Sequence, residues 1–426
     1  MDLYGEFAWR GLIYDETEGV RELLAREKVT AYAGFDPTAA SLHVGHLLPI
    51  LSLARMQRFG HAPIALVGGG TGLIGDPSFK AAERALLSLE QVEQNAAGIR
   101  AQLSRFLDFE DAANPARLEN NADWLTKLSA IEFMRDVGKH FSVNAMMTKE
   151  SVKRRLESED GISYTEFSYP LLQAYDFLML HDRFNCTVQL GGSDQWGNIT
   201  AGMDLIRRVR GSKAYGLVLP LLMTAAGTKF GKTEAGSVWL DPQLTSPFRF
   251  YQFWLNTDDS DVGKQLKFFT FLDAPAVQAL EEATARSPQQ REAQRTLARE
   301  VTTLVHGPER ALRAEHASSV LFGEDIATLA ADEVLAVFDD VPSSTVSSEA
   351  VAGEGVPVVE LLSASGLTAS KGEAVRLIRG GGVYVNNRRI TDERARLRAS
   401  DAIEGRLFVL RKGAKQNHVV KIGSVI

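Results

Sequence analysis

Cysteine is almost missing from this sequence, which holds one, Cys186, among 426 residues. A single cysteine cannot form an intramolecular disulfide, which excludes a disulfide-stapled fold and fits a reducing compartment such as the cytoplasm. No stretch approaches the roughly 20 apolar residues that a membrane span needs. The first twelve residues, MDLYGEFAWRGL, carry two acids and no apolar run of signal-peptide length. We therefore expect neither a secretory leader nor a membrane partner.

Several common catalytic motifs are also missing or incomplete. We find no plausible Ser-His-acid or Cys-His constellation in the sequence. Gly231-Lys232-Thr233 fails as a P-loop, because Ala226 stands where that motif needs glycine. The stretch Gly70–Gly75 formally matches GxGxxG but follows the second expected strand, and Asp76 then comes where a helix should begin. Dinucleotide binding is thus disfavoured, and a glycine-lined loop near a ligand, ending in Asp76, is better supported.

Positive charge is scarce in most of the chain but not at its end. Residues 357–426 hold 13 Lys and Arg against 6 Asp and Glu, a net charge of +7. Residues 1–356 hold 34 against 48, a net charge of −14. This asymmetry predicts a basic C-terminal module with a polyanionic partner. A locally basic, solvated surface is the alternative.

Apolar runs and helical patterns alternate in the first half of the chain. Short apolar runs at 29–35 and 63–69 flank an amphipathic helix expected at 43–59. This spacing is typical of a right-handed βαβ crossover and hence of a parallel sheet. Further strands are expected at 187–192 and 217–223. We predict an α/β fold with a Rossmann-like, nucleotide-binding parallel sheet.

The length requires two or three domains. We expect the α/β domain over 1–245, with a helical insertion at about 81–160 that supplies a dimer contact. Aromatic-dense and helical patterns at 246–340 indicate a small all-helical domain. Residues 341–356 are rich in serine and small side chains and indicate a linker. Residues 357–426 mix short helices and strands, with a hairpin turn expected at Asn386-Asn387.

The stretch 32–46, YAGFDPTAASLHVGH, joins the first strand to the first helix of the crossover. A glycine-containing turn that leads into a helix N-terminus is suited to anions, and Ser41 is a plausible N-cap. His43 and His46 are three residues apart and share one helix face. They could face a ligand or be ordinary surface or capping histidines. A zinc site is disfavoured, since no further ligand stands at a suitable spacing.

Other polar groups could line the same pocket. Tyr169, Gln173 and Asp176 fall at i, i+4 and i+7 and so share one face of a helix. A polar face is usually the solvent side, but the apolar neighbours of Asp176 make a pocket wall credible. A glycine turn ends at Asp194, and Lys229 and Lys232 lie in a glycine-punctuated loop. Such groups suit phosphoryl or nucleotidyl transfer, which depends on positioning and charge neutralisation.

Six stretches together resemble one family. HVGH and KFGKT are similar to the two signatures of class I aminoacyl-tRNA synthetases. YAGFDPTAASLHVGHL, VGGGTGLIGDPS, FSYPLLQAYDF and QLGGSDQWGNI are similar to stretches of the bacterial tyrosyl-tRNA synthetases. The tail, from VVELLSASGL to VYVNNRRI, resembles the alpha-L RNA-binding module. The resemblance spans essentially the whole chain.

The resemblance implies an enzyme that activates L-tyrosine with ATP, releases pyrophosphate and transfers the tyrosyl group to tRNA(Tyr). It implies a homodimer, Mg²⁺ accompanying ATP, no tightly bound cofactor, and an anticodon-side role for the helical domain. Tyr32 and Asp176 would bind the substrate phenol. The other residues implied for the amino acid are Asp76, Tyr169 and Gln173 around the ammonium group, with Gln189 and Gln195 in support.

The resemblance also assigns residues to ATP and RNA. Those implied around the nucleotide are Gly34, Asp36, Gly192 and Asp194. Those implied at the departing pyrophosphate are Thr38, His43, His46, Lys229 and Lys232, with Lys80 and Arg84 as further candidates. Phe79 and Pro49 depart from the residues that many relatives carry, which leaves details of the ATP contacts open. The tail arginines implied at RNA phosphates are Arg376, Arg379, Arg388 and Arg389.

Two alternatives remain at the level of the sequence. Another class I synthetase, that for tryptophan above all, would share the signatures but lack the Tyr32 and Asp176 pair. A non-catalytic RNA-binding protein would keep the tail, but the intact HVGH and KFGKT stretches argue against it.

Overall fold

The computed structural model describes residues 2–76, 86–157, 161–223, 230–233, 236–321, 326, 329–338, 341–413 and 416–423. It divides the chain into two compact units. The first unit holds Met1–Thr245 and Phe253–Val305, and the second holds Ser246–Gln252 and His306–Ile426. In the described part of the chain, no helix is long and apolar enough to cross a membrane.

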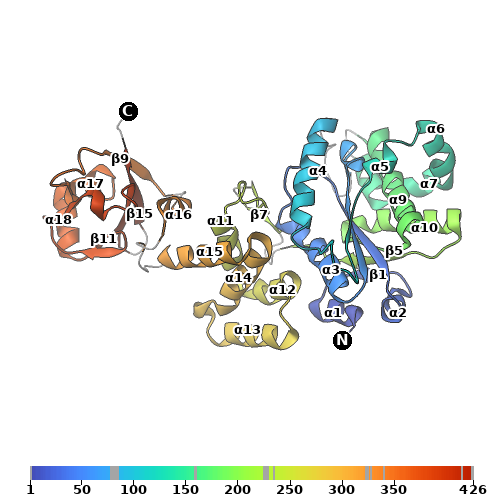
Figure 1. The fold of residues 1–426 in the computed structure, drawn as a ribbon, viewed down its shortest axis with the longest axis horizontal. Helices are drawn as coiled ribbons and strands as arrows, with labels where there is room; N and C mark the ends of the chain where they lie inside the picture. Colours follow the sequence, from blue (N-terminus) through green and yellow to red (C-terminus); the bar gives the residue numbers. More distant parts are fainter. Residues whose placement is uncertain are drawn as a thin grey trace. The chain divides into compact units, whose positions relative to one another are not determined.

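A six-stranded sheet forms the centre of the first unit (Figure 1). Its order is β1(Asp15–Glu16), β6(Tyr215–Leu219), β5(Cys186–Gly192), β2(Thr30–Phe35), β3(Ala62–Val67) and β4(Arg117–Asn120). The short β1 pairs antiparallel with β6, and all other neighbours are parallel. The predicted α/β class with a parallel sheet is confirmed.

Helices cover both faces of this sheet, as Figure 1 shows. One face carries α3(Leu47–Arg58) and α4(Leu89–Leu103), and the other carries α9(Tyr164–Phe184) and α10(Trp196–Arg210). The central strand β2 is accordingly buried on both sides, with Ala31, Tyr32 and Ala33 all almost inaccessible. This explains why the central strands read as continuous apolar runs rather than as alternating patterns.

The segment predicted as a helical insertion at 81–160 contributes to the sheet itself. Helix α4 lies between β3 and β4 in the chain and packs on β3, and β4 is the edge strand. The short helices come only afterwards. They are α5(Ala122–Leu125), α6(Ala130–Glu132), α7(Val143–Met147) and α8(Glu150–Leu156), with a π turn Phe133–Val137 and a 3₁₀ turn Gly138–His140 between them.

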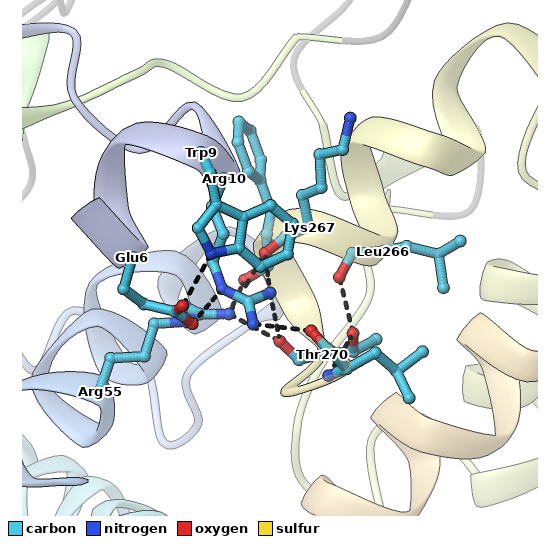
Figure 2. A network of polar contacts seen from close by, with 9 residues as sticks. Glu6, Trp9, Arg10, Arg55, Leu266, Lys267 and Thr270 are labelled. Atoms are coloured by element: carbon cyan, nitrogen blue, oxygen red, sulfur yellow. Dashed lines mark hydrogen bonds and ion pairs between the residues drawn. The ribbon is translucent and has the colours of Figure 1, made fainter. Parts of the chain in front are cut away.

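Two further helices begin the chain, and a helical part follows the sheet. The first are α1(Leu3–Arg10) and α2(Val20–Arg26). The later ones are α11(Pro247–Leu255), α12(Asp259–Phe269), α13(Ala274–Arg286) and α14(Glu292–His306). Figure 2 shows how α12 is attached: Arg10 and Arg55 donate hydrogen bonds to the carbonyl oxygens of Lys267 and Thr270 at its C-terminal end. These buried guanidinium groups satisfy carbonyls that a helix end leaves unpaired.

The second unit is built on a five-stranded sheet. Its order is β12(Arg388–Ile390), β11(Val383–Val385), β14(Leu407–Lys412), β15(Gln416–Gly423) and β9(Ser343–Ser347). Two helices, α17(Val358–Ala364) and α18(Lys371–Arg379), share a core with Phe408 and Leu410 of β14. The alternate residues of β14, Leu407 and Val409, share a second core with α15(Pro308–Leu321) and α16(Ala331–Val337).

These cores differ from the boundaries expected from the sequence. The segment predicted as a linker, 341–356, contains β9, which pairs in parallel with β15. Helices α15 and α16, expected in a separate helical domain, pack on the tail sheet. The reason is that both faces of β14 are apolar, and α17 and α18 cover only one of them. A short two-stranded sheet of β10(Val356–Pro357) and β13(Arg396–Leu397) completes the unit.

The predicted hairpin turn in the tail is confirmed. Asn386 and Asn387 join β11 to β12 with φ values of 49° and 60°. Two consecutive residues with positive φ form the turn that matches the twist of a tight hairpin, and asparagine tolerates this conformation better than most residues.

Candidate active site

The crevice of the first unit lies where the strand order reverses. Strands β2 and β5 are parallel neighbours, but the chain continues from β2 to β3 on one side and from β5 to β6 on the other. In open parallel sheets, ligands bind at the carboxyl ends of the strands at such a point. Asp36 directly follows β2, and β5 ends at Gly192, so both predicted nucleotide positions lie at this edge.

A chain of hydrogen bonds runs along this edge. Asp36 accepts from the Thr71 hydroxyl at 2.7 Å and from the Tyr169 hydroxyl at 2.8 Å. The Asn121 amide donates to the Thr71 hydroxyl at 2.9 Å and to the Asp176 carboxylate at 2.8 Å. The predicted residues Asp36, Tyr169 and Asp176 therefore belong to one network, built by residues of α9 and of the segments that follow β2, β3 and β4.

Asp176 is almost fully buried in this network. Its other carboxylate oxygen accepts a hydrogen bond from the Trp124 indole at 2.7 Å. Burial raises the pKa of Asp176 to about 8, although the hydrogen bonds from Asn121 and Trp124 act to lower it. A carboxyl group with so high a pKa, in a crevice beside other polar groups, is typical of a binding or catalytic site.

Tyr32 and Gln189 carry buried polar atoms without partners. They are register partners in the parallel pair of β2 and β5, so their side chains point to the same face of the sheet. Tyr32 is 1% exposed and Gln189 is 2% exposed. Within the described part of the chain, the Tyr32 hydroxyl and the Gln189 amide oxygen make no hydrogen bond. Since unsatisfied buried polar groups are costly, this pair points to a polar ligand group.

Tyr32 and Asp176 lie near one another but are not hydrogen-bonded. Burial raises the pKa of the Tyr32 phenol well above its usual value of 10, and the negative charge of Asp176 raises this pKa further. The two groups that the resemblance assigns to one substrate phenol are thus neighbours in the structure. Each of them could still contact a hydroxyl placed between them.

A second group of polar side chains joins α9 to the start of α10. Asn198 donates to Gln173 and to Gln195, both at 3.1 Å. Gln195 donates to Asp76 at 2.7 Å. Asp194 lies beside them, within 3.4 Å of the Gln195 amide nitrogen. The predicted face of Tyr169, Gln173 and Asp176 therefore points into the crevice and not to the solvent.

The glycine-rich loop after β3 is shaped by contacts within the protein. A Cβ atom on Gly70 would lie 3.0 Å from the Leu125 side chain, and one on Gly72 would lie 2.9 Å from the ring of Pro37. A Cβ on Gly191, at the end of β5, would lie 2.9 Å from the Gln195 side chain. The glycines are therefore needed for close packing against neighbouring side chains, whether or not the loop also contacts a ligand.

The histidine turn is a 3₁₀ turn, Val44–His46, that leads into α3. His43, and not Ser41, is its N-cap: its Nδ1 accepts from the Gly45 N–H at 3.0 Å. His46 Nδ1 accepts in turn from the His43 N–H at 3.1 Å. Acceptance at Nδ1 fixes the tautomer that carries its proton on Nε2 in both rings. Ser41 instead receives hydrogen bonds from Gln102 and from the backbone N–H of Asp241.

The lysine loop is described only at its end. Lys229 lies outside the described residues, as do Lys80, Arg84 and Phe79. The backbone of Lys232 belongs to β7(Lys232–Thr233), which pairs with β8(Gly236–Ser237). Gly231 contacts Val44 of the histidine turn so closely that a Cβ there would overlap it. The two signature motifs therefore meet in space.

The remaining predicted residues take varied positions. Gly34 and Thr38 are exposed at the crevice edge, and Thr38 donates its N–H to the Asp36 carbonyl. In the tail, Arg379 forms an ion pair with Glu393, and Arg389 donates to the Gly381 carbonyl. Two other tail arginines, Arg376 and Arg388, are exposed.

Several residues of the network were not predicted from the sequence. They are Thr71, Asn121, Trp124 and Asn198. The signal that could have indicated Asn121 and Trp124 is their position directly after β4, since residues after parallel strands meet at the same edge.

Two family models match this chain. A family model described as tRNA synthetases class I (W and Y) matches residues 24–323. A model of the tyrosine–tRNA ligase SYY-like C-terminal domain matches residues 333–420. The second match begins before the expected linker, in agreement with the packing of α16 on the tail sheet.

Curated relatives match over nearly the whole chain. A tyrosine–tRNA ligase of Roseiflexus castenholzii is 57% identical over 417 residues, covering 98% of each chain. One of Geobacillus stearothermophilus is 54% identical over 424 residues, covering 99% of this chain and 100% of that one. Among solved structures, a C-terminally truncated mitochondrial tyrosyl-tRNA synthetase of Aspergillus nidulans aligns with a TM-score of 0.68 at 33% identity, covering 75% of this chain and 94% of that one.

Proposed function

The chain belongs to the tyrosine–tRNA ligase family of class I tRNA synthetases, and we propose that the crevice between β2 and β5 is where it activates L-tyrosine with ATP. The tyrosine carboxylate attacks the α-phosphorus of ATP, and pyrophosphate leaves. A terminal ribose hydroxyl of tRNA(Tyr) then attacks the tyrosyl carbonyl, and AMP leaves. Neither step needs a covalent nucleophile from the protein, so positioning and charge neutralisation carry the catalysis.

The unpartnered pair Tyr32 and Gln189, beside Asp176, is the observation that carries this proposal. The hydroxyl of a substrate phenol placed there accepts a hydrogen bond from the Tyr32 hydroxyl and donates a hydrogen bond to Asp176. Phenylalanine would fill the same space but leave these buried groups without partners, which costs about 1–3 kcal/mol for each such group. The pocket is therefore suited to tyrosine and rejects phenylalanine.

The substrate ammonium group is assigned to the polar face of α9 and the residues opposite it. Asp76 supplies a carboxylate, and Tyr169 and Gln173 supply neutral oxygens around the cation. The bond from Gln195 to Asp76 and that from Asn198 to Gln173 hold two of these groups in place. Such support keeps the amino acid oriented for attack on ATP.

The histidine turn is assigned to the phosphates of ATP, with Gly34, Asp36, Gly192 and Asp194 around the rest of the nucleotide. His43 and His46 both present an Nε2–H donor, because Nδ1 of each ring accepts from the backbone. Negative charge grows on the departing pyrophosphate in the transition state, so donors here lower the barrier more than they strengthen ATP binding. Thr38, Lys229 and Lys232 are proposed to act on the same group.

Mg²⁺ is proposed to enter as part of the Mg–ATP substrate. Within the described ranges, no group of three or more His, Cys, Asp or Glu side chains could hold a metal ion. The ion would then rely on the phosphate oxygens of ATP and on water, an arrangement that Mg²⁺ commonly adopts.

A homodimer is proposed through the short helices after β4. Large apolar side chains are exposed along this segment, among them Ile131, Met134, Val143 and Met147. Val137 is buried and Phe133 packs on the core, so this segment has apolar side chains that face the core and others that face outward. An exposed apolar patch of this kind is typical of a protein interface. Replacing Ile131 with glutamate should yield monomers in sedimentation, whereas an unchanged dimer would contradict this assignment.

The tail is proposed to bind tRNA(Tyr), since its net charge is +7 and its exposed arginines suit a phosphate backbone. The single buried cysteine is consistent with activity in the cytoplasm.

Charging of tRNA tests the proposed function. Purified protein with ATP, Mg²⁺ and bacterial tRNA should transfer labelled tyrosine into acid-precipitable RNA. Labelled tryptophan under the same conditions should not be transferred. Transfer of tryptophan, or of neither amino acid, would contradict the proposal.

A further inference from the structure

A three-residue strip, Val238–Leu240, joins the two signature motifs through its backbone. The Val238 carbonyl accepts from the Val44 N–H at 2.9 Å, and the Val238 N–H donates to the Gly231 carbonyl at 3.1 Å. The Leu240 N–H donates to the Leu42 carbonyl at 2.8 Å. The strip thus pairs with the stretch that carries His43 and, on its other side, holds the end of the lysine loop.

The strip and the two motifs that it joins carry buried apolar side chains. Val44, Val238 and Leu240 are buried. Phe230, at the described end of the lysine loop, stacks on Phe269 with ring centroids 5.3 Å apart and an interplanar angle of 13°. The strip therefore lies among packed apolar side chains of the fold.

Trp239 is the residue of the strip that faces His43. The two form an isolated antiparallel bridge pair, and their ring centroids lie 6.1 Å apart at an interplanar angle of 66°. The backbone N–H of Trp239 donates to the Thr245 hydroxyl at 3.0 Å, which fixes the strip on its far side. The His43 ring also lies against the His46 ring, with centroids 4.0 Å apart. Contacts with both rings favour one orientation of the imidazole.

Resting on the proposed function, we propose that Trp239 is a positioning residue for the activation step, whose indole ring, through its T-shaped contact, holds the His43 imidazole with its Nε2–H toward the departing pyrophosphate. The hydrogen bond from the Gly45 N–H fixes the tautomer of His43 and directs its Nδ1, and the contact with Trp239 further limits the rotation of the ring. A ring free to rotate would spend part of its time with the donor turned away, so the loss falls on the rate of activation and not on the binding of tyrosine.

A double-mutant cycle separates positioning from a general structural role. The four proteins are the wild type, Trp239→Leu, His43→Ala and the double variant, measured by tyrosine-dependent exchange of pyrophosphate into ATP. Trp239→Leu should lower kcat by roughly 5- to 20-fold at an unchanged KM for tyrosine, a modest share of the effect expected for a lost catalytic donor. In the His43→Ala background the same substitution should change kcat by less than about 2-fold.

Three controls complete the design. Trp239→Phe keeps an aromatic edge and should retain most of the rate. Trp9→Leu replaces another half-buried tryptophan, on α1, and should leave the rate unchanged. If Trp239→Leu does not fold, as judged by thermal unfolding, Trp239→Met keeps more side-chain volume and takes its place in the cycle.

Equal losses with and without His43 would show that Trp239 only supports the fold, and an undiminished rate in Trp239→Leu would also overturn the proposal. Wild-type protein that exchanges no pyrophosphate with tyrosine would instead refute the proposed function itself.

Discussion

Tyr32 on β2 and Gln189 on β5 are register partners, and neither the buried Tyr32 hydroxyl nor the buried Gln189 amide oxygen has a hydrogen-bond partner among the residues that the structure describes. The described side chains supply hydrogen-bond partners for Asp176, Asp36 and Gln173 but supply none for these two oxygen atoms. The difference marks the place where a ligand, and not the protein, completes the hydrogen bonding.

Replacing Tyr32 with phenylalanine should weaken selectivity without weakening the fold. The substitution removes a buried hydroxyl that has no partner, so the free energy of unfolding should stay constant or rise by up to about 1 kcal/mol. The preference for tyrosine over phenylalanine in pyrophosphate exchange should fall roughly tenfold, the value of one hydrogen bond of about 1.4 kcal/mol. Tyr14→Phe, at an exposed tyrosine, is the matched control. A clear loss of stability in Tyr32→Phe would show that its hydroxyl has a partner in the free protein.

Asp176→Asn should change how stability depends on pH. The pKa of Asp176 is raised to about 8 in the folded protein, while an unfolded aspartate ionises near pH 4. The folded state therefore holds a proton that the unfolded chain releases, and stability is lost as the pH rises from about 4 to about 8. Between pH 5 and 8 the wild type should lose up to about 4 kcal/mol relative to Asp176→Asn, about 1.4 kcal/mol per pH unit. Denaturant titrations across this range measure the difference, and parallel profiles would argue against a protonated Asp176.

His43→Ala should slow activation and leave tyrosine binding nearly unchanged. In the proposed mechanism the Nε2–H donor acts on charge that develops only in the transition state, and removing such a donor typically costs about 10²- to 10³-fold in rate. Single-turnover formation of the adenylate measures the rate, and equilibrium dialysis measures the affinity for tyrosine. A collapse of tyrosine affinity would place His43 against the amino acid and not against the phosphates.

Removal of residues 341–426 should separate the two half-reactions. Pyrophosphate exchange should persist, because the crevice belongs to the first unit. Charging of tRNA should fall sharply, because the basic tail is lost. The truncation also uncovers Val334 and Phe338, which share a core with β14, so the truncated protein should be less soluble. Loss of exchange in soluble truncated protein would show that the tail takes part in activation.

The periodicity of α9 could be read from the sequence because helical spacing is a local property. Tyr169, Gln173 and Asp176 had to share one face, and the structure turns that face into the crevice. The central strands could also be predicted from the sequence, since strands buried on both faces appear as continuous apolar runs. The roles of individual residues came from the resemblance of the motifs and not from any pattern of spacing.

Two strands that the sequence alone does not place in their sheets depend on pairing with distant parts of the chain. Strand β4 has the sequence RLEN and lies at the sheet edge, so its short polar pattern alone does not show that it joins the parallel sheet and brings Asn121 into the crevice. Strand β9 lies in a serine-rich segment that is typical of linkers, and only its pairing with β15, more than 70 residues away, makes it a strand. The sequence favours Ser41 as the N-cap, but the turn begins later. The His43 and His46 side chains instead accept hydrogen bonds from the N–H groups of Gly45 and His43.

The ratio of kcat/KM for tyrosine to that for phenylalanine in pyrophosphate exchange tests the central claim most directly, because it measures what the unpartnered Tyr32 and Gln189 pair and Asp176 do together. Wild-type protein should prefer tyrosine by at least about 10³-fold, the expected effect of leaving two or more buried groups without partners. A ratio near one, or equal exchange with tryptophan, would contradict the account.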